Sequence, residues 1–430
     1  MTVMAYVRRC ALVVALASAG LAAGCSRSVD DRTSAELMRL YRARDYFTLR
    51  ERLATLPTAP VTLVARAAVQ HAFNRPDSSN ATIGTLLARH DVPDSLRLEA
   101  RRLELSNDMR LYRYGAARDV AAAILAAPWA PADSAEHADL ENARRLGAAL
   151  ADVPPQALTG RVATTVVLEG GHLPVTVNGH RRSYLLDTGA NLSVLMRSEA
   201  DSLGLGIRPA GVEVGTATDV KVTADLAVAD SVRLGGLAYA NVVFLVLPDK
   251  ALTLPGGTRI PGGGFRIPGI LGFPLIEPMG ELRIRGDTVS VPASVPKRPV
   301  HNLALEQFSM LTPVRWRGSV FICQFDTGAN TTSFYEPFYR RYTDAVEAAG
   351  IADTARVGGA GGIRRIPVFR LPTATLSLAD TTVTLRNVDV YRTVIRDSAD
   401  NYAYCNIGQD VLRQFRALII NLRSMSLLLD

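Results

Sequence analysis

The stretch Leu186-Asp187-Thr188-Gly189-Ala190-Asn191 recurs later in the chain as Phe325-Asp326-Thr327-Gly328-Ala329-Asn330. The two copies are offset by 139 residues, the separation of Asp187 from Asp326. Each copy places an apolar residue before an aspartate and a glycine two positions after it. An apolar strand that runs into a tight polar turn is the local structure that this pattern predicts.

The similarity extends beyond the motif in both directions. The same offset aligns Pro174 with Pro313 and Gly179 with Gly318, without a gap. Further on, Ile270-Leu271-Gly272 matches Asn406-Ile407-Gly408, and alternating apolar residues follow both segments. Short β-branched runs between Gly, Pro and Asn or Asp turns indicate an all-β region from about 160 to 430. We therefore predict two copies of one β unit.

A pair of aspartates in such loops carries a specific chemistry. Two carboxylates in contact cannot both be ionised, so they share one proton. The ionised member can take a proton from water while the neutral member protonates a peptide carbonyl. Such a pair titrates as a unit, so the sequence assigns neither Asp187 nor Asp326 as the acid. A lone Asp-Thr-Gly is more often a turn, whereas two in register favour catalysis.

The paired motif resembles the retropepsin and pepsin superfamily of aspartic peptidases. The resemblance implies two lobes, at 160–295 and 300–430, with Asp187 and Asp326 as the catalytic residues and no need for a homodimer. It also implies supporting roles for both loops. The hydroxyls of Thr188 and Thr327 would cross-brace the two loops, and Gly189 and Gly328 would let the carboxyl groups approach closely. Asn191 and Asn330 stand where the family often has a Ser or Thr that is hydrogen-bonded to the outer carboxylate oxygen.

The resemblance extends to a flap and a cleft wall. The run 357–362 resembles a glycine-rich flap and contributes Gly358, Gly359, Gly361 and Gly362. The alternative is a hairpin tip without that role. Residues 214–218 of the first copy match a flap more weakly. The loop Ala251–Pro268 has no match in the second copy and is a candidate cleft wall.

Two cysteines lie at related positions in the second copy. Cys323 precedes Asp326 by three residues, and Cys405 precedes Gly408 by three. The family fold places those strands side by side, so the resemblance implies a disulfide, which an oxidising compartment permits. The corresponding pair in the first copy is Tyr184 and Gly269, a large residue facing a small one. Two buried free thiols are the alternative.

Helical periodicity dominates the region 34–151. Met38-Arg39-Leu40-Tyr41-Arg42 recurs as Met109-Arg110-Leu111-Tyr112-Arg113, an offset of 71 residues from Met38 to Met109. This is about twice the 34-residue period of tetratricopeptide-type helix pairs. We predict a helical-repeat domain with a protein partner, although a generic helical bundle fits the pattern as well.

The N-terminus has the shape of a secretory signal. Arg8 and Arg9 precede a short apolar run that ends in Leu21-Ala22-Ala23-Gly24-Cys25, which resembles a bacterial lipoprotein cleavage site. The resemblance implies a signal peptide over 1–24, a lipid on Cys25 and a tether over 25–33. An ordinary signal peptide is the alternative. Ser26 does not resemble the aspartate that retains lipoproteins at the inner membrane, so we expect an envelope protein, lipid-anchored outside the cytoplasm, on the outer membrane.

Composition excludes several other classes of protein. The formal net charge is +7, but the basic residues are scattered, which argues against nucleic-acid binding. The chain has 4 cysteines and 6 histidines, and no spacing among them indicates a zinc site. We therefore expect neither a metal nor a cofactor.

Together these features predict a multidomain α+β protein, with an N-terminal α-helical repeat domain followed by an all-β bilobal unit like a pepsin or retropepsin. The leading hypothesis is an aspartic endopeptidase that hydrolyses peptides or proteins. A second is a non-catalytic envelope lipoprotein that binds a peptide or protein in the same cleft and with the helical repeats. A third is a structural envelope scaffold, which no sequence feature favours.

Overall fold

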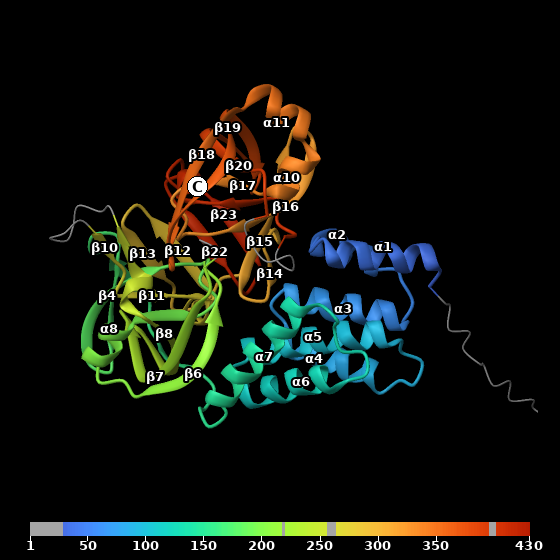
Figure 1. The fold of residues 1–430 in the computed structure, drawn as a ribbon, viewed down its shortest axis with the longest axis horizontal. Coiled ribbons are helices and arrows are strands. Elements are labelled where there is room, and N and C mark those ends of the chain that lie inside the picture. Colours follow the sequence, from blue (N-terminus) through green and yellow to red (C-terminus); the bar gives the residue numbers. More distant parts are fainter. Residues whose placement is uncertain (1–28, 217–219, 256–263, 395–400) are drawn as a thin grey trace, which may run out of the picture.

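A computed structural model describes residues 29–216, 220–255, 264–394 and 401–430. The described chain forms a helical unit and two β lobes, blue to cyan, green to yellow and orange to red in Figure 1. The predicted signal peptide and residues 25–28 of the predicted tether, Cys25 among them, lie outside the described residues, as do 217–218 of the weaker flap match and 256–263 of the candidate cleft wall. Within the described ranges, no helix is long and apolar enough to cross a membrane.

The helical unit begins earlier than predicted. Helix α1 starts at Asp31, because the Asp30 side chain accepts a hydrogen bond from the Thr33 amide and caps the first turn. Residues 31–33, which were expected to be tether, are therefore helical. The seven helices are α1 (Asp31–Arg42), α2 (Tyr46–Leu53), α3 (Pro60–Ala72), α4 (Pro76–Leu87), α5 (Asp94–Arg110), α6 (Tyr114–Ala126) and α7 (Ser134–Ala149).

One turn geometry joins α1 to α2, α3 to α4 and α5 to α6. Each turn has a residue with positive φ: Arg44 at 55°, Asn74 at 58° and Tyr112 at 56°. In each, that residue donates its N–H to the carbonyl three residues back, as Arg44 does to Tyr41. The repeated pentapeptide does not follow this period, because Tyr41 lies in α1 whereas Tyr112 is itself the turn residue.

Lobe one is an eight-stranded sheet in the order β1-β8-β5-β11-β4-β3-β7-β6. Its strands are β1 (Ala157–Arg161), β3 (Leu173–Val177), β4 (His180–Leu186), β5 (Ser193–Met196), β6 (Ile207–Val214), β7 (Val222–Leu234), β8 (Leu237–Leu247) and β11 (Gly269–Leu271). Short additions are α8 (Arg197–Ser202), η1 (Asp249–Leu252), the pair β9 (Thr253–Pro255) and β10 (Gly264–Arg266), α9 (Phe273–Ile276) and η2 (Glu277–Met279).

Lobe two is also an eight-stranded sheet, in the order β14-β15-β16-β21-β17-β20-β19-β18. Its strands are β14 (Ala304–Glu306), β15 (Ser309–Trp316), β16 (Ser319–Phe325), β17 (Ser333–Phe334), β18 (Ile351–Gly359), β19 (Gly362–Leu378), β20 (Thr381–Tyr391) and β21 (Cys405–Ile407). Its helices are α10 (Glu336–Arg341), α11 (Thr343–Ala349) and α12 (Gln409–Leu412).

The two lobes repeat one central arrangement. In lobe one, β11 lies between β4, which it pairs in parallel, and β5, which it pairs antiparallel. In lobe two, β21 lies between β16 and β17 with the same two orientations. In each lobe, the strand that ends just before Gly272 or Gly408 thus lies beside the strand that leads into the Asp-Thr-Gly loop. The duplication in the sequence is a duplication of structure.

A third sheet joins the lobes, in the order β2-β13-β12-β22-β23. Its strands are β2 (Thr164–Val167), β12 (Glu281–Arg285), β13 (Thr288–Val291), β22 (Leu418–Asn421) and β23 (Ser426–Leu429). Because β12 of the first copy pairs antiparallel with β22 of the second, the lobes share a hydrogen-bonded base.

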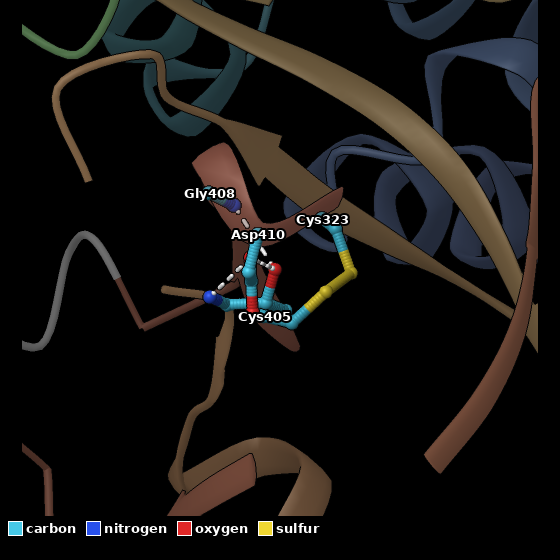
Figure 2. The surroundings of a disulfide bond; sticks show 5 residues. Cys323, Cys405, Gly408 and Asp410 are labelled. Carbon is cyan, nitrogen blue, oxygen red and sulfur yellow. Dashed lines mark hydrogen bonds between the residues drawn. A yellow bond between two sulfur atoms is a disulfide. The ribbon is translucent and has the colours of Figure 1, made fainter. Parts of the chain in front are cut away.

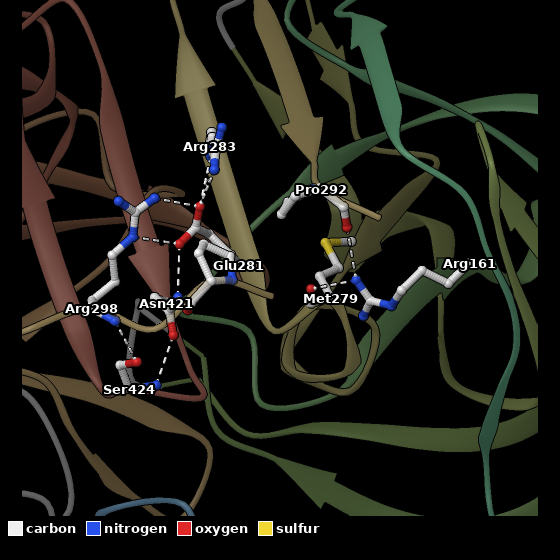
Figure 3. Close-up of polar contacts among 9 residues, drawn as sticks. Arg161, Met279, Glu281, Arg283, Pro292, Arg298, Asn421 and Ser424 are labelled. Atoms are coloured by element: carbon white, nitrogen blue, oxygen red, sulfur yellow. Dashed lines mark hydrogen bonds and ion pairs between the residues drawn. The ribbon is translucent and has the colours of Figure 1, made fainter. Parts of the chain in front are cut away.

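A buried carboxylate stabilises this base (Figure 3). Glu281 is buried and accepts hydrogen bonds from Arg298 at 2.7 and 2.8 Å, from Asn421 at 2.7 Å and from Arg283 at 2.7 Å. Burial alone would raise the pKa of Glu281, but these bonds lower it below its ordinary value. Nearby, Arg161 donates to the carbonyls of Met279 at 3.1 Å and Pro292 at 3.2 Å.

Candidate active site

In each lobe, the aspartate of the Asp-Thr-Gly loop directly follows the last residue of a central strand, β4 or β16. The Asp187 amide donates to the Leu271 carbonyl at 3.0 Å, and the Asp326 amide donates to the Ile407 carbonyl at 3.0 Å. The ladder between the two central strands of each lobe therefore fixes where its aspartate begins. The shared sheet beneath the lobes then sets the two loops against each other.

The two loops are bonded to each other through their threonines, which are buried. The Thr188 amide donates to Thr327 Oγ1 at 3.1 Å, and the Thr327 amide donates to Thr188 Oγ1 at 2.9 Å. Each hydroxyl then donates to a carbonyl of the opposite strand, Thr188 to Phe325 and Thr327 to Leu186, both at 3.3 Å. This near-symmetric set of four bonds satisfies buried polar groups and holds the loops in one geometry.

The glycines bring the carboxyl groups together. A Cβ on Gly189 would lie 2.6 Å from Asp326 Cγ, and a Cβ on Gly328 would collide in the same way with the Asp187 carboxyl group. Each carboxyl group therefore occupies the space that a side chain on the opposite loop would fill. The two carboxyl groups are also close enough that the negative charge of Asp326 acts on the pKa of Asp187.

The hydrogen bonds that reach the two carboxyl groups differ. Asp187 Oδ1 accepts from the Gly189 amide at 2.8 Å. Asp326 Oδ1 accepts from the Gly328 amide at 2.8 Å and the Ala329 amide at 3.2 Å. Asp326 Oδ2 accepts a further bond, from Asn406 Nδ2 at 2.9 Å. Because the Ala190 amide also interacts with the Asp187 carboxyl group, the difference between the two is the side-chain bond from Asn406 to Asp326.

The pKa of Asp187 reflects this environment. Burial first, and then the negative charge of Asp326, raise the pKa of Asp187 to about 8. Asp187 is therefore protonated at neutral pH and can donate its proton.

The side-chain bond to the outer oxygen of Asp326 comes from a residue that the sequence reasoning did not single out. Asn191 and Asn330 are exposed, and among the described residues neither donates to a carboxylate. Asn406 donates instead, from the neighbouring strand β21. The sequence does contain a sign of this role, because Asn406 aligns with Ile270 of the first copy and so places a polar residue where the first copy has an apolar one.

The glycine run of lobe two forms a hairpin tip between β18 and β19. Gly359 pairs with Gly362 across the tip, and Gly361 and Gly362 have φ values of 90° and 112°. Gly358 lies one pair further down the hairpin, opposite Ile363. The tip reaches lobe one, where the Gly361 amide donates to the Ala251 carbonyl at 2.9 Å. The hairpin therefore bridges the lobes.

The corresponding hairpin of lobe one, β6 and β7, is attached to the helical unit. Asn142 of α7 donates to the Glu213 carbonyl and accepts from the Glu213 amide, both at 2.7 Å. Arg208 of β6 donates to the Ala149 carbonyl at 3.2 Å and forms an ion pair with Asp152. The two hairpins are thus held differently, one across the lobes and the other against α7.

Lobe two contains a disulfide between Cys323 of β16 and Cys405 of β21 (Figure 2). The Gly408 amide donates to Thr332 Oγ1 at 3.0 Å, and Thr332 donates through its amide and hydroxyl to Asp410. In lobe one the matching position is filled without a covalent bond. A Cβ on Gly269 would lie 2.6 Å from the Tyr184 ring, so that ring takes the space of the bridge.

The described residues include no group of three or more His, Cys, Asp or Glu side chains placed to hold a metal ion. The chemistry that the two Asp-Thr-Gly loops support is that of two neighbouring carboxyl groups.

Parts of the chain are similar to known aspartic proteases. Residues 173–275, which span lobe one from β3 to α9, match the family model described as aspartyl protease. A retropepsin-like aspartic protease from Rickettsia conorii is 19% identical over 32% of this chain and 94% of its own, with a TM-score of 0.20. No curated protein matches the sequence. The recognised family region contains Asp187, and Asp326 occupies the same place in the second copy of the fold.

Proposed function

We propose that the chain is an aspartic endopeptidase whose dyad is Asp187 and Asp326. The observation that carries the proposal is that each carboxyl group lies against the glycine of the opposite loop, which brings the two aspartates together. The aspartyl protease match over lobe one supports it. Because both loops belong to one chain, the proposed site needs no second copy of the protein.

The two carboxyl groups would have different roles in the first step. Asp326, ionised and facing three donors, takes a proton from a water molecule held between the carboxyl groups. The water oxygen bonds to the peptide carbonyl carbon while protonated Asp187 donates its proton to the carbonyl oxygen. Asp326 then gives its proton to the amide nitrogen, one of the two hydroxyl groups on the former carbonyl carbon returns a proton to Asp187, and the C–N bond breaks, which releases an amine and a carboxylic acid. The dyad ends with one proton, as it began.

Substitution of each aspartate tests the proposal. Asp187→Asn and Asp326→Asn should each abolish cleavage of a peptide library assayed at several pH values, while the circular dichroism spectrum stays unchanged. A statine-type transition-state mimic should inhibit the wild-type protein. Normal turnover by either variant would refute the dyad. If the folded wild-type protein binds peptides but cuts none at any pH, the chain is a binding protein instead.

We also propose that the protein is lipid-anchored on Cys25 outside the cytoplasm. The segment Leu21–Cys25 supports the anchor, and the disulfide between Cys323 and Cys405 is consistent with an oxidising compartment. Expression with a radiolabelled fatty acid should label the wild-type protein and leave Cys25→Ser unlabelled and released from the membrane fraction. Labelling of Cys25→Ser would contradict the anchor.

For the helical unit, we propose a repeat of helix pairs with a partner protein. The common turn at Arg44, Asn74 and Tyr112 supports the repeat. Crosslinking in intact cells followed by mass spectrometry would test for a partner. Crosslinks only within the chain would indicate that the helical unit serves the β lobes alone.

A further inference from the structure

One row of residues differs in chemistry between the two lobes. In lobe one, Ile270 of β11 pairs with Leu185 of β4 and Val194 of β5. In lobe two, the corresponding strands pair Asn406 of β21 with Gln324 of β16 and Ser333 of β17. Paired residues on adjacent strands present their side chains to the same face of a sheet. We name the two sets the apolar row (Leu185, Ile270, Val194) and the polar row (Gln324, Asn406, Ser333).

The polar row lies beside the proposed catalytic carboxyl groups. Gln324 precedes Asp326 by two residues, so both side chains leave the strand on one face. Asn406 touches that face directly, because its Nδ2 donates to Asp326 Oδ2 at 2.9 Å. Its chain neighbours Cys405 and Ile407 belong to the hydrophobic core on the opposite face. A peptide bound at the dyad would therefore place a side chain against the polar row.

The polar row contains an unsatisfied acceptor. Asn406 is 7% exposed and Gln324 is 6% exposed. Within the described part of the chain, Asn406 Oδ1 is buried without a hydrogen-bond partner. A buried carbonyl oxygen without a donor costs free energy, which a ligand N–H or O–H can remove and an apolar ligand group cannot. Because Asn406 Oδ1 is a hydrogen-bond acceptor, a ligand group that satisfies it must be a donor.

Tyrosines lie beside the polar row. Gln324 donates to the Tyr402 hydroxyl at 3.4 Å. Tyr335 stacks on Tyr391 with ring centroids 6.0 Å apart, and Tyr402 packs against their cluster. In lobe one, Met196 pairs with Leu247 at the place of the two stacked tyrosines. The difference between the lobes therefore extends beyond one substitution.

The apolar row continues into a hydrophobic cluster. Ile270 and Val194 are buried in it, Leu185 packs against it, and the flap residue Ala360 contacts it from lobe two. A polar side chain placed there would lose water without gaining a hydrogen bond. The two sides of the dyad thus offer opposite chemical environments.

We propose that the polar row is a specificity subsite for a substrate side chain with a neutral hydrogen-bond donor, a carboxamide or a hydroxyl, on one side of the scissile bond. The apolar row receives an apolar side chain on the other side. This inference rests on the proposed peptidase function for the scissile bond, but its binding preference can be measured without turnover.

Non-cleavable peptides provide the test. A reduced-amide hexapeptide would carry Asn, Asp or Leu, which are close in shape, at each of the two positions that flank the reduced bond. Calorimetry should show Asn binding about tenfold more tightly than Leu on one side only, with Leu preferred on the other. Asp should bind worse than Asn on that side, because it offers an acceptor beside Asp326. On the same side, a peptide with Thr should likewise bind more tightly than one with Val, which has nearly the same shape but no hydroxyl.

Variants then assign the preference to the polar row. Gln324→Leu combined with Asn406→Ile and Ser333→Val gives the polar row the residues of the apolar row, and should reverse the preference to Leu on both sides. Val320→Thr, at an exposed position of the same strand, is the matched control and should keep the Asn preference. Equal or apolar preference on both sides in the wild-type protein would overturn the subsite, even if the variants fail to fold. Failure of the wild-type protein to cut any cleavable peptide, despite a one-sided Asn preference, would overturn the peptidase proposal and leave the subsite standing.

Discussion

Asp187 is a half-buried carboxyl group whose surroundings raise its pKa. Amides of its own loop act on each aspartate, Gly189 and Ala190 on Asp187 and Gly328 and Ala329 on Asp326, and Asp326 also accepts a bond from the Asn406 side chain. Ile270, the counterpart of Asn406, has no donor to offer. A single residue difference between two duplicated loops therefore helps to divide the proposed roles of acid and base.

The raised pKa of Asp187 predicts how activity and stability depend on pH. The ordinary value is 3.8 and the folded value is about 8, so the folded protein binds a proton that the unfolded chain releases. That contribution to stability is complete below about pH 4 and is lost as the pH rises to about 8. Activity should fall above about pH 8, when Asp187 loses its proton. Thermal unfolding of the wild-type protein and Asp187→Asn across this range should show the loss only in the wild-type protein.

The glycine of lobe two gives a steric prediction at the same scale. Gly328→Ala should abolish peptide cleavage, because its Cβ would occupy the position of the Asp187 carboxyl group. Gly84→Ala is the control, since no atom lies within 4 Å of a Cβ there and alanine favours the helix. Cleavage kinetics with unfolding curves would check both. An active Gly328→Ala would mean that the carboxyl groups do not meet as described.

At the scale of elements, the two lobes fill the space between their central strands, beneath the Asp-Thr-Gly loop, with different side chains. The central strands lie so close that Gly269 admits the ring of Tyr184, whereas lobe two has Cys323 and Cys405 bonded at the matching positions. The bridge joins residues separated by 82 positions, a stretch that contains the β18–β19 hairpin. It constrains the unfolded lobe more than the folded one.

Removal of the bridge should therefore weaken lobe two. Cys323→Ala combined with Cys405→Ala should lower the free energy of unfolding by about 2–4 kcal/mol. Urea unfolding of the oxidised protein, the reduced protein and the double variant measures this. The reduced protein and the variant should agree with each other, and unchanged midpoints in both would contradict a stabilising bridge.

For the molecule as a whole, the three equivalent turns of the helical unit contact three parts of the β region. Arg44 forms an ion pair with Glu306 of lobe two at 3.0 Å. Asn74 Nδ2 donates to the Leu422 carbonyl beside the shared sheet at 3.0 Å, and the Tyr112 hydroxyl donates to the Pro274 carbonyl of lobe one at 3.1 Å. The helical unit therefore braces both lobes and their junction, as its position in Figure 1 also indicates.

The ion pair between Arg110 and Glu277 tests this brace. The Arg110 side chain is 0% exposed and lies 2.8 Å from Glu277 of lobe one. Glu277→Ala should destabilise the protein by about 3 kcal/mol, because it leaves a buried guanidinium without its carboxylate. Asp119→Ala removes the partner of Arg118 at an exposed site and should change stability little. Calorimetric unfolding that showed equal effects would argue against a rigid brace.

The sequence by itself determined the duplicated β unit, the helical region and the two aspartates, because these follow from local periodicity and from a motif repeated along the chain. Tertiary structure alone decided the features that join distant residues. Asn406 reaches Asp326 across 80 positions, the Gly361 amide at the β18–β19 tip donates to the Ala251 carbonyl, and the turns of the helical unit contact both lobes. Each depends on strand register and lobe packing, which fix the positions of side chains that no local pattern relates.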